Sequence, residues 1–269
     1  MAELGTVTFY LALVAYSAAA TLFFAHLARR EQAVLTRWAP WLLGLAVLLH
    51  TGQVMIASVV THTCPVESLQ FGISLSAVMV GASYLMLRRR LNIDALGVAV
   101  APLALMLLVG TQFVGSGSEN NLPRTLLALH ITSNVLGFAL FLLAGFAGAF
   151  YVILERRLKA KRVLAVHAKL PALDALDRAE HRLLLAGFPL LTFGAVTGAM
   201  FMHDVTHMSS AAWVRAVLAY ATWVLVALVL ILRRVAGWRG RRSAYGTLAS
   251  VACVVAVVLI YVLQAGTGA

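Results

Sequence analysis

The sequence predicts an all-α protein, a polytopic transmembrane bundle of about eight helices with both termini on the outer side of the membrane. Of its 269 residues, 62% are hydrophobic and only 12% are charged. A water-soluble domain of this length has no place to bury so much apolar surface. Apolar runs recur at lengths close to the roughly 20 residues that a helix needs to cross a bilayer. Basic residues gather in alternate loops, which sets the predicted orientation.

Eight apolar runs predict eight spans, at residues 7–27, 38–60, 71–87, 93–114, 126–154, 183–202, 213–232 and 244–264. The third run is short for a membrane span. The longest polar segment, residues 155–182, lies between the fifth and sixth runs and is predicted to be a cytoplasmic loop. No soluble segment is large enough to fold alone, so we expect a single integral membrane domain over residues 1–269.

Nineteen of the 21 lysines and arginines fall in four loops on one side of this topology, at residues 28–37, 88–90, 155–182 and 233–242. Only Arg124 and Arg215 fall on the other side. Because cytoplasmic loops carry the excess of basic residues, these four loops are predicted to be cytoplasmic. The net charge of +11 is therefore interpreted as a topology signal and a surface for anionic lipid, and nucleic-acid binding is not expected.

Two histidines, His50 and His130, lie well inside predicted spans, where burying an ionisable side chain is costly and usually serves a function. His50 is near the middle of the second span, and His130 is about one turn inside the outer end of the fifth. Each shares its helical face with small and polar residues, which are Ala46, Gln53 and Ala57 beside His50, and Asn134, Gly137, Ala144 and Gly148 beside His130. Such a stripe marks the side that faces other helices, so both histidines are predicted to point into the bundle.

Neutral imidazole is a good ligand for iron, and haem in a helical bundle is usually held by such nitrogens. The predicted cofactor is therefore non-covalent haem b, with His50 and His130 as ligands of the iron. The alternative interpretation is structural, with each histidine hydrogen-bonded to a backbone carbonyl and holding two helices together. The sequence leaves both interpretations open.

Patterns typical of other chemistries are missing from the sequence. It has no His/Cys cluster at zinc spacing, no C-x-x-C for thiol exchange and no C-x-x-C-H for covalent haem attachment. It also has no Ser/His/Asp set, glycine-rich phosphate loop or paired carboxylates, so hydrolysis and phosphoryl transfer are not expected and the chain is not predicted to be an enzyme. Gly194 and Gly198 form a G-x-x-x-G pair, which we interpret as a helix-packing feature.

Four stretches stand out in order along the chain. The first is Leu49-His50-Thr51 with the CPVESL that follows at 64–69, and the second is Leu129-His130-Ile131. The third is ALDRAEHRLLLAGFPLLTFGAVTGA, which ends at residue 199, and the fourth is GWRGRRSAY at 237–245. Together they resemble the CcsA family of cytochrome c assembly proteins from about residue 40 to 250. Each stretch alone is a modest match, and their order and predicted sides of the membrane add specificity.

The resemblance implies a haem-handling bundle in a bacterial inner membrane. His50 would match a transmembrane haem-ligand histidine, and His130 the first of two outward-facing histidines that bracket haem. The synthases of that family carry a tryptophan-rich segment after the sixth helix, where this sequence reads HDVTHMSS at 203–210. The second external histidine, expected near the C-terminal LQAGTGA, is also missing. We hypothesise that His203 or His207 replaces it, and the pattern is closest to the short HemX and YpjD-like branch.

These features favour a protein that binds haem and moves or presents it in c-type cytochrome biogenesis. Its expected partners are haem, membrane lipid and other cytochrome c assembly proteins. The HemX resemblance implies an alternative, a membrane regulator of haem biosynthesis whose cytoplasmic loops at 155–182 and 233–242 contact an enzyme such as glutamyl-tRNA reductase. A third class is an accessory subunit or small-solute transporter with structural histidines, for which Pro102 and Pro189 are too little evidence of broken helices.

Overall fold

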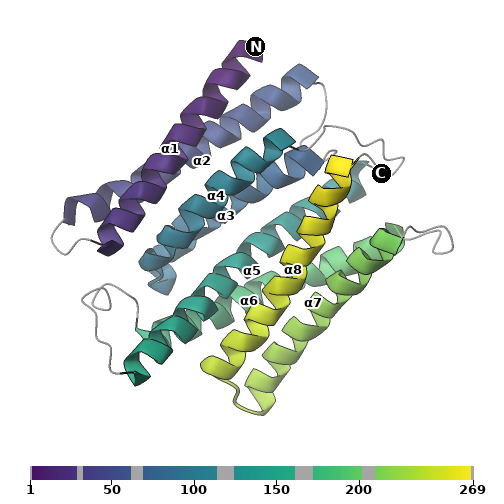
Figure 1. The fold of residues 1–269 in the computed structure, drawn as a ribbon. Coiled ribbons are helices and arrows are strands. Elements are labelled where there is room, and N and C mark those ends of the chain that lie inside the picture. Colours follow the sequence, from purple (N-terminus) through teal and green to yellow (C-terminus); the bar gives the residue numbers. More distant parts are fainter. Residues whose placement is uncertain are drawn as a thin grey trace. The chain divides into compact units, whose positions relative to one another are not determined.

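The computed structural model describes residues 2–28, 33–61, 69–113, 124–160, 172–201 and 210–267, and this part of the chain is helical with no strand. The α-helices are α1 (Ala2–Ala28), α2 (Ala33–Thr61), α3 (Leu69–Leu91), α4 (Gly97–Gly110), α5 (Arg124–Lys159), α6 (Leu173–Phe201), α7 (Ser210–Val235) and α8 (Arg241–Thr267) (Figure 1). Two 3₁₀ turns, η1 (Asp94–Leu96) and η2 (Thr111–Phe113), flank α4. The predicted all-helical fold class is confirmed.

Six helices in the described part of the chain are long and apolar enough to cross a membrane, namely α1, α2, α3, α5, α6 and α7. The fourth predicted span is a shorter apolar stretch, Asp94–Gly110, formed by η1 and α4. The eighth predicted run lies within α8, which has 27 residues. The chain is therefore a multi-pass membrane protein, and the outer position of its termini stays a prediction.

Several helices extend beyond the apolar runs that predicted them. The third run ends at Leu87, whereas α3 continues through three arginines to Leu91. Arginine is a good helix former, and positive charge near a helix C-terminus interacts favourably with the helix dipole. Asn92, at φ 54°, follows the last residue of α3 in the left-handed conformation that commonly ends helices.

The predicted cytoplasmic loop at 155–182 is helical at both described ends. α5 continues to Lys159, and α6 begins at Leu173, ten residues before the apolar run that predicted it. Residues 161–171 lie outside the described part of the chain. The structure divides into two compact units. The early start of α6 matters because it brings charged side chains of residues 176–182 into the second unit.

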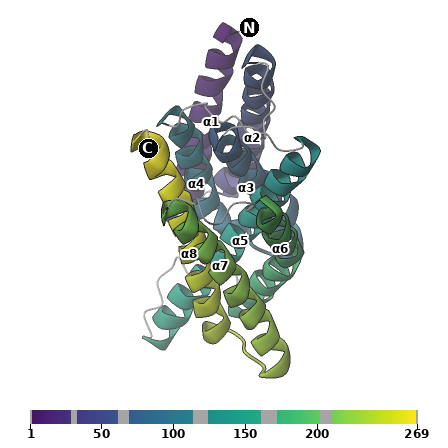
Figure 2. The same cartoon turned by 90° about the vertical axis from the view of Figure 1, so that its right-hand side faces the viewer.

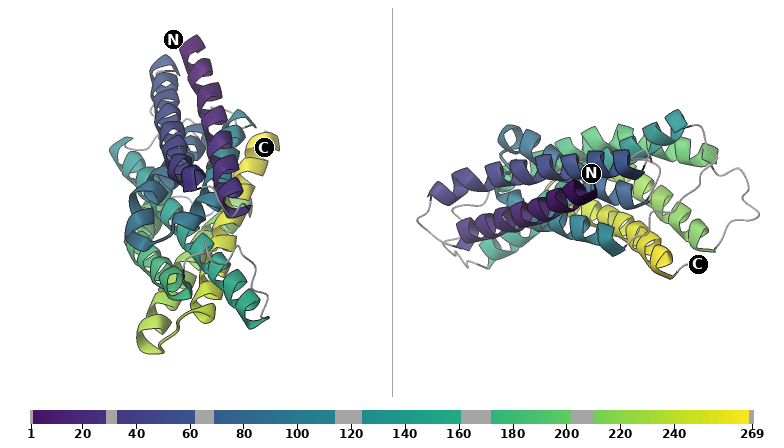
Figure 3. Two further views of the ribbon diagram at one scale, coloured as in Figure 1. Left: turned by 90° about the vertical axis from the view of Figure 1, so that its left-hand side faces the viewer. Right: turned by 90° about the horizontal axis from the view of Figure 1, so that it is seen from above.

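The first compact unit comprises Met1–Asn120 and Leu154–Ala175. In it, α1 packs against α2 and α4, and α3 packs against the same two helices. Figure 3 shows α1, in purple, alongside α2. The packing is close where α4 begins, because a Cβ on Gly97 would overlap the Phe23 ring of α1 and lie 2.6 Å from the Tyr84 hydroxyl of α3. Each of the four helices thus has two neighbours, and His50 of α2 lies among them.

The second compact unit comprises Asn121–Ile153 and Leu176–Ala269. Here α7 and α8 lie side by side and are joined by a short turn (Figure 2). Glycines of α5 allow close approach of two other helices. A Cβ on Gly137 would lie 3.4 Å from a side chain of α6, and one on Gly148 would lie 3.4 Å from the Cα of Ala244 in α8. The predicted small-residue stripe of α5 therefore does face other helices.

Candidate functional site

His50 is fully buried in the first unit, as its small-residue stripe predicted. Its Nε2 lies 2.7 Å from the hydroxyl oxygen of Ser74 on α3. Its Nδ1 lies 3.4 Å from the Tyr16 hydroxyl on α1, and the two rings meet edge to face with centroids 5.9 Å apart. Ala46, one turn earlier on α2, is also fully buried. His50 thus connects α2 to α1 and α3 through two hydroxyl groups.

These contacts bear on both interpretations of His50. A buried histidine that links three helices has the partners that a structural role requires, although those partners are side-chain hydroxyls and not the backbone carbonyls of the structural interpretation. In a histidine that binds a metal through one ring nitrogen, the other ring nitrogen usually forms a hydrogen bond that fixes the orientation of the ring. Ser74 is placed to form such a bond with Nε2 of His50.

The residues around His50 fit an iron ligand in their chemistry. Iron needs a neutral imidazole with one free lone pair, and the other ring nitrogen can keep a hydroxyl partner. The Tyr16 contact is the longer and weaker of the two. Because the ring is fully buried, iron reaches it only after one of the two hydroxyl-bearing side chains has moved.

His130 lies in the second unit on α5 and faces α6. Its Nδ1 is 2.7 Å from the Thr197 hydroxyl oxygen. The side-chain amide nitrogen of Asn134 lies 3.2 Å from His130 Nε2 and donates to the His130 carbonyl oxygen at 2.9 Å. A Cβ on Gly198 would lie 3.4 Å from the imidazole Cε1. His130 is therefore half-buried among polar groups of two helices, with its ring orientation fixed by hydrogen bonds.

The other two predicted ligands, His203 and His207, lie outside the described residues. Within the described part of the chain, no group of three or more His, Cys, Asp and Glu side chains is placed to hold a metal ion. Haem iron takes only one or two ligands from the protein, because the macrocycle supplies the others, so a haem site does not require such a group.

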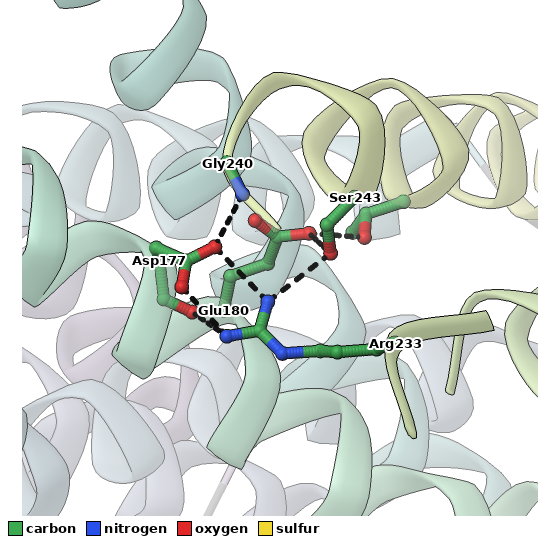
Figure 4. Close-up of polar contacts among 6 residues, drawn as sticks. Asp177, Glu180, Arg233, Gly240 and Ser243 are labelled. Atoms are coloured by element: carbon green, nitrogen blue, oxygen red, sulfur yellow. Dashed lines mark hydrogen bonds and ion pairs between the residues drawn. The ribbon is translucent and has the colours of Figure 1, made fainter. Parts of the chain in front are cut away.

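A buried ion pair between α6 and α7 is the largest feature that sequence reasoning missed (Figure 4). Arg233 donates to the two carboxylate oxygens of Asp177 at 2.6 and 3.0 Å. The side chains are only 8% and 10% exposed, respectively. The same carboxylate accepts the backbone N–H of Gly240 at 2.7 Å, immediately before α8. Asp177 thus ties the end of α7 and the start of α8 to α6.

Glu180 lies one turn further along α6 and is fully buried (Figure 4). Its Oε1 accepts hydrogen bonds from the hydroxyls of Ser243, at 2.9 Å, and Thr247, at 2.6 Å. Its Oε2 has no hydrogen-bond partner among the described residues. The neighbouring cation, Arg233, is engaged with Asp177. Glu180 therefore fixes α8 to α6 through hydrogen bonds to one oxygen, without an ion pair of its own in the described structure.

Glu180→Gln is expected to change the stability of the protein little, because the amide carbonyl keeps both hydrogen bonds and the NH₂ group only replaces a buried carboxyl oxygen that already has no partner among the described residues. Glu180→Ala should cost about 1–3 kcal/mol, since it leaves two buried hydroxyls without their acceptor. Thermal unfolding of the detergent-solubilised variants measures both effects. Equal losses in the two variants would show that the negative charge of Glu180, and not its acceptor oxygen, stabilises the fold.

The sequence carried a signal for this cluster. The chain has only ten acidic residues, and two of them, Asp177 and Glu180, lie three positions apart among basic ones, on one face of a helix. Arg178 and Arg182, on the opposite face, are exposed. The GWRGRRSAY stretch contributed to the family resemblance and overlaps the predicted cytoplasmic loop at 233–242, and in the structure it also supplies Gly240 and Ser243 to the cluster.

The comparisons with known proteins agree with the sequence resemblance. The model of the family described as "Cytochrome C assembly protein" matches residues 42–265. CcsA, a cytochrome c biogenesis protein of Synechocystis sp., is 29% identical over 92 residues, which cover 34% of this chain and 28% of that protein. The CcsA protein of Guillardia theta is 24% identical over 216 residues, 66% of this chain and 65% of that protein.

The inner membrane protein YpjD of Escherichia coli K12 is 28% identical over 114 residues, which are 42% of each chain. The aligned parts thus span less than two thirds of each of these three relatives. No solved structure matches the chain. The family match includes both candidate histidines and the whole cluster of Figure 4.

Proposed function

The chain belongs to the cytochrome c assembly protein family, and on this basis we propose that it binds haem non-covalently and handles it during c-type cytochrome biogenesis. The observation that carries the proposal is His50, a fully buried imidazole in mid-helix whose ring is oriented by Ser74. The likeness to an inner membrane protein supports a location in a bacterial inner membrane. Other assembly proteins and membrane lipid are the proposed partners.

Each residue has a proposed part in binding. His50 supplies a neutral nitrogen to the iron, and Ser74 keeps the ring oriented through the other nitrogen. Tyr16, at 3.4 Å, is the side chain that yields its place. His130 is the proposed ligand toward the outer face, with His203 or His207 as its counterpart. Haem would supply a redox-active iron, while the chain binds it and excludes water.

The visible spectrum of the purified protein tests this proposal. The wild type is expected to show a Soret band after haem supplementation. His50→Ala is expected to lose most of it, because the methyl group of alanine has no donor atom for iron. His50→Met should keep haem with an altered spectrum, since methionine also binds haem iron. Exogenous imidazole should restore the band in His50→Ala.

A His50→Ala variant that unfolds would not by itself distinguish a ligand from a structural histidine, which is why the methionine variant and imidazole rescue belong to the experiment. A folded wild type without a Soret band after supplementation would overturn the proposal. It would leave the alternative function, a membrane regulator of haem biosynthesis that acts through a partner such as glutamyl-tRNA reductase.

A further inference from the structure

The hydrogen bond between His130 and Thr197 has a direction that the helix backbone determines. Thr197 is buried, and its hydroxyl lies 2.7 Å from the Phe193 carbonyl oxygen and 3.2 Å from the Gly194 carbonyl oxygen, one turn back on α6. A carbonyl oxygen only accepts, and a hydroxyl has a single hydrogen to donate. The hydroxyl hydrogen of Thr197 is therefore directed to its own helix.

It follows that the Thr197 oxygen acts as an acceptor toward His130. The 2.7 Å contact with Nδ1 is a hydrogen bond only if Nδ1 carries the hydrogen. A neutral imidazole has one N–H, so Nε2 then carries the lone pair of the ring. The tautomer of His130 is thus set by the backbone of α6, through one hydroxyl.

Asn134, one turn further along α5, contacts the same ring. Its amide nitrogen donates to the His130 carbonyl oxygen at 2.9 Å, which fixes which end of the amide is the NH₂ group. That nitrogen also lies 3.2 Å from His130 Nε2. The same nitrogen lies 3.4 Å from Nδ1, so its contact with the ring does not distinguish the two tautomers, and the assignment rests on Thr197.

The glycine pair of α6 makes room for this arrangement. A Cβ on Gly194 would overlap the Asn134 side-chain oxygen and lie 2.6 Å from its Cγ, and one on Gly198 would lie 3.4 Å from His130 Cε1. The G-x-x-x-G pair was interpreted as a packing feature. In the structure it provides the space in which the His130 and Asn134 side chains meet α6.

We propose that Thr197 is a positioning residue that holds His130 in the Nδ1–H tautomer and so presents Nε2 as the nitrogen that ligates iron. The second half of this statement rests on the proposed haem function. The first half concerns the chain alone and holds in the haem-free protein.

The test is nitrogen NMR of the full-length, haem-free protein with ¹⁵N-labelled histidine, in which the two ring nitrogens report which of them bears hydrogen. The His130 signal is identified by its loss in His130→Gln. We expect the Nδ1–H tautomer in the wild type and in Thr197→Ser, which keeps the hydroxyl. Thr197→Val, of nearly the same shape but without an acceptor, should lose it. An Nε2–H signal in the wild type, or an unchanged tautomer in Thr197→Val, overturns the assignment.

Haem titration then separates this inference from the proposed function. Thr197→Val is expected to weaken haem binding by about 10–100-fold, the usual effect of removing a residue that orients a metal ligand, and Thr197→Ser should bind as the wild type does. If Thr197→Val fails to fold, Thr197→Ala serves in its place. If the wild type has the expected tautomer but binds no haem, the proposed function is contradicted, and the role of Thr197 in setting the tautomer of His130 still holds. If all variants bind haem with equal affinity, the proposed role of Thr197 in iron ligation is overturned.

Discussion

Arg233→Met is expected to destabilise the protein by about 3–5 kcal/mol, the usual cost of removing one partner of a buried ion pair. The substitution leaves the Asp177 carboxylate, 10% exposed, without its cation. A methionine fills much the same volume as the aliphatic part of arginine, so the loss reports the charge and its hydrogen bonds more than the packing. The midpoint of thermal or denaturant unfolding in detergent measures the change.

Arg234 provides the matched control, because it is the next residue of α7 and is exposed. Arg234→Met should change stability by less than about 0.5 kcal/mol. Combining Arg233→Met with Asp177→Asn should recover part of the loss, since the asparagine oxygen still accepts the Gly240 N–H and no buried charge is left unpaired. Similar losses for the two arginine variants, or purely additive losses in the double variant, would contradict the assigned ion pair.

The helices themselves followed from the sequence because apolar length and basic loops are local properties. The ends of the helices were harder to predict where charged residues form part of the helix. The segment from Leu173 to Arg182 reads as a polar loop, yet Leu176, Ala179 and Leu183 are buried on one face of α6. That face also contains Asp177 and Glu180, whose charge and polarity conceal the helical period of the buried residues.

The inward orientation of His50 and His130 was predictable from the residues one turn away on their own helices. Their partners were not. Tyr16 and Ser74 lie 34 and 24 residues from His50, and Thr197 lies 67 residues from His130. The local sequence around a serine, threonine or tyrosine in a membrane helix does not indicate which distant side chain it will contact. The same holds for Arg233, which lies 56 residues from Asp177 and looks like any other arginine of a cytoplasmic loop.

Gly240→Ala is expected to cost about 2–4 kcal/mol, for two separate reasons. Gly240 has φ +62°, a left-handed conformation that disfavours any residue with a Cβ. A Cβ there would also overlap the hydroxyl of Tyr151 on α5 and lie 3.0 Å from its Cζ. Relief of that overlap shifts the Gly240 N–H, which donates to Asp177 at 2.7 Å. The substitution therefore strains the turn and weakens the link between α6 and α8.

Gly237 separates the two causes, because it lies in the same turn at φ +65° but a Cβ there would have no atom within 4 Å. Gly237→Ala should therefore cost only the conformational penalty, about 1–2 kcal/mol. In the Tyr151→Phe background, which removes the overlapping hydroxyl, Gly240→Ala should cost close to what Gly237→Ala costs. Unfolding midpoints of these variants and of Tyr151→Phe alone give the comparison. Equal losses at the two glycines would mean that the close approach of Tyr151 contributes nothing, and that the turn tolerates a side chain facing α5.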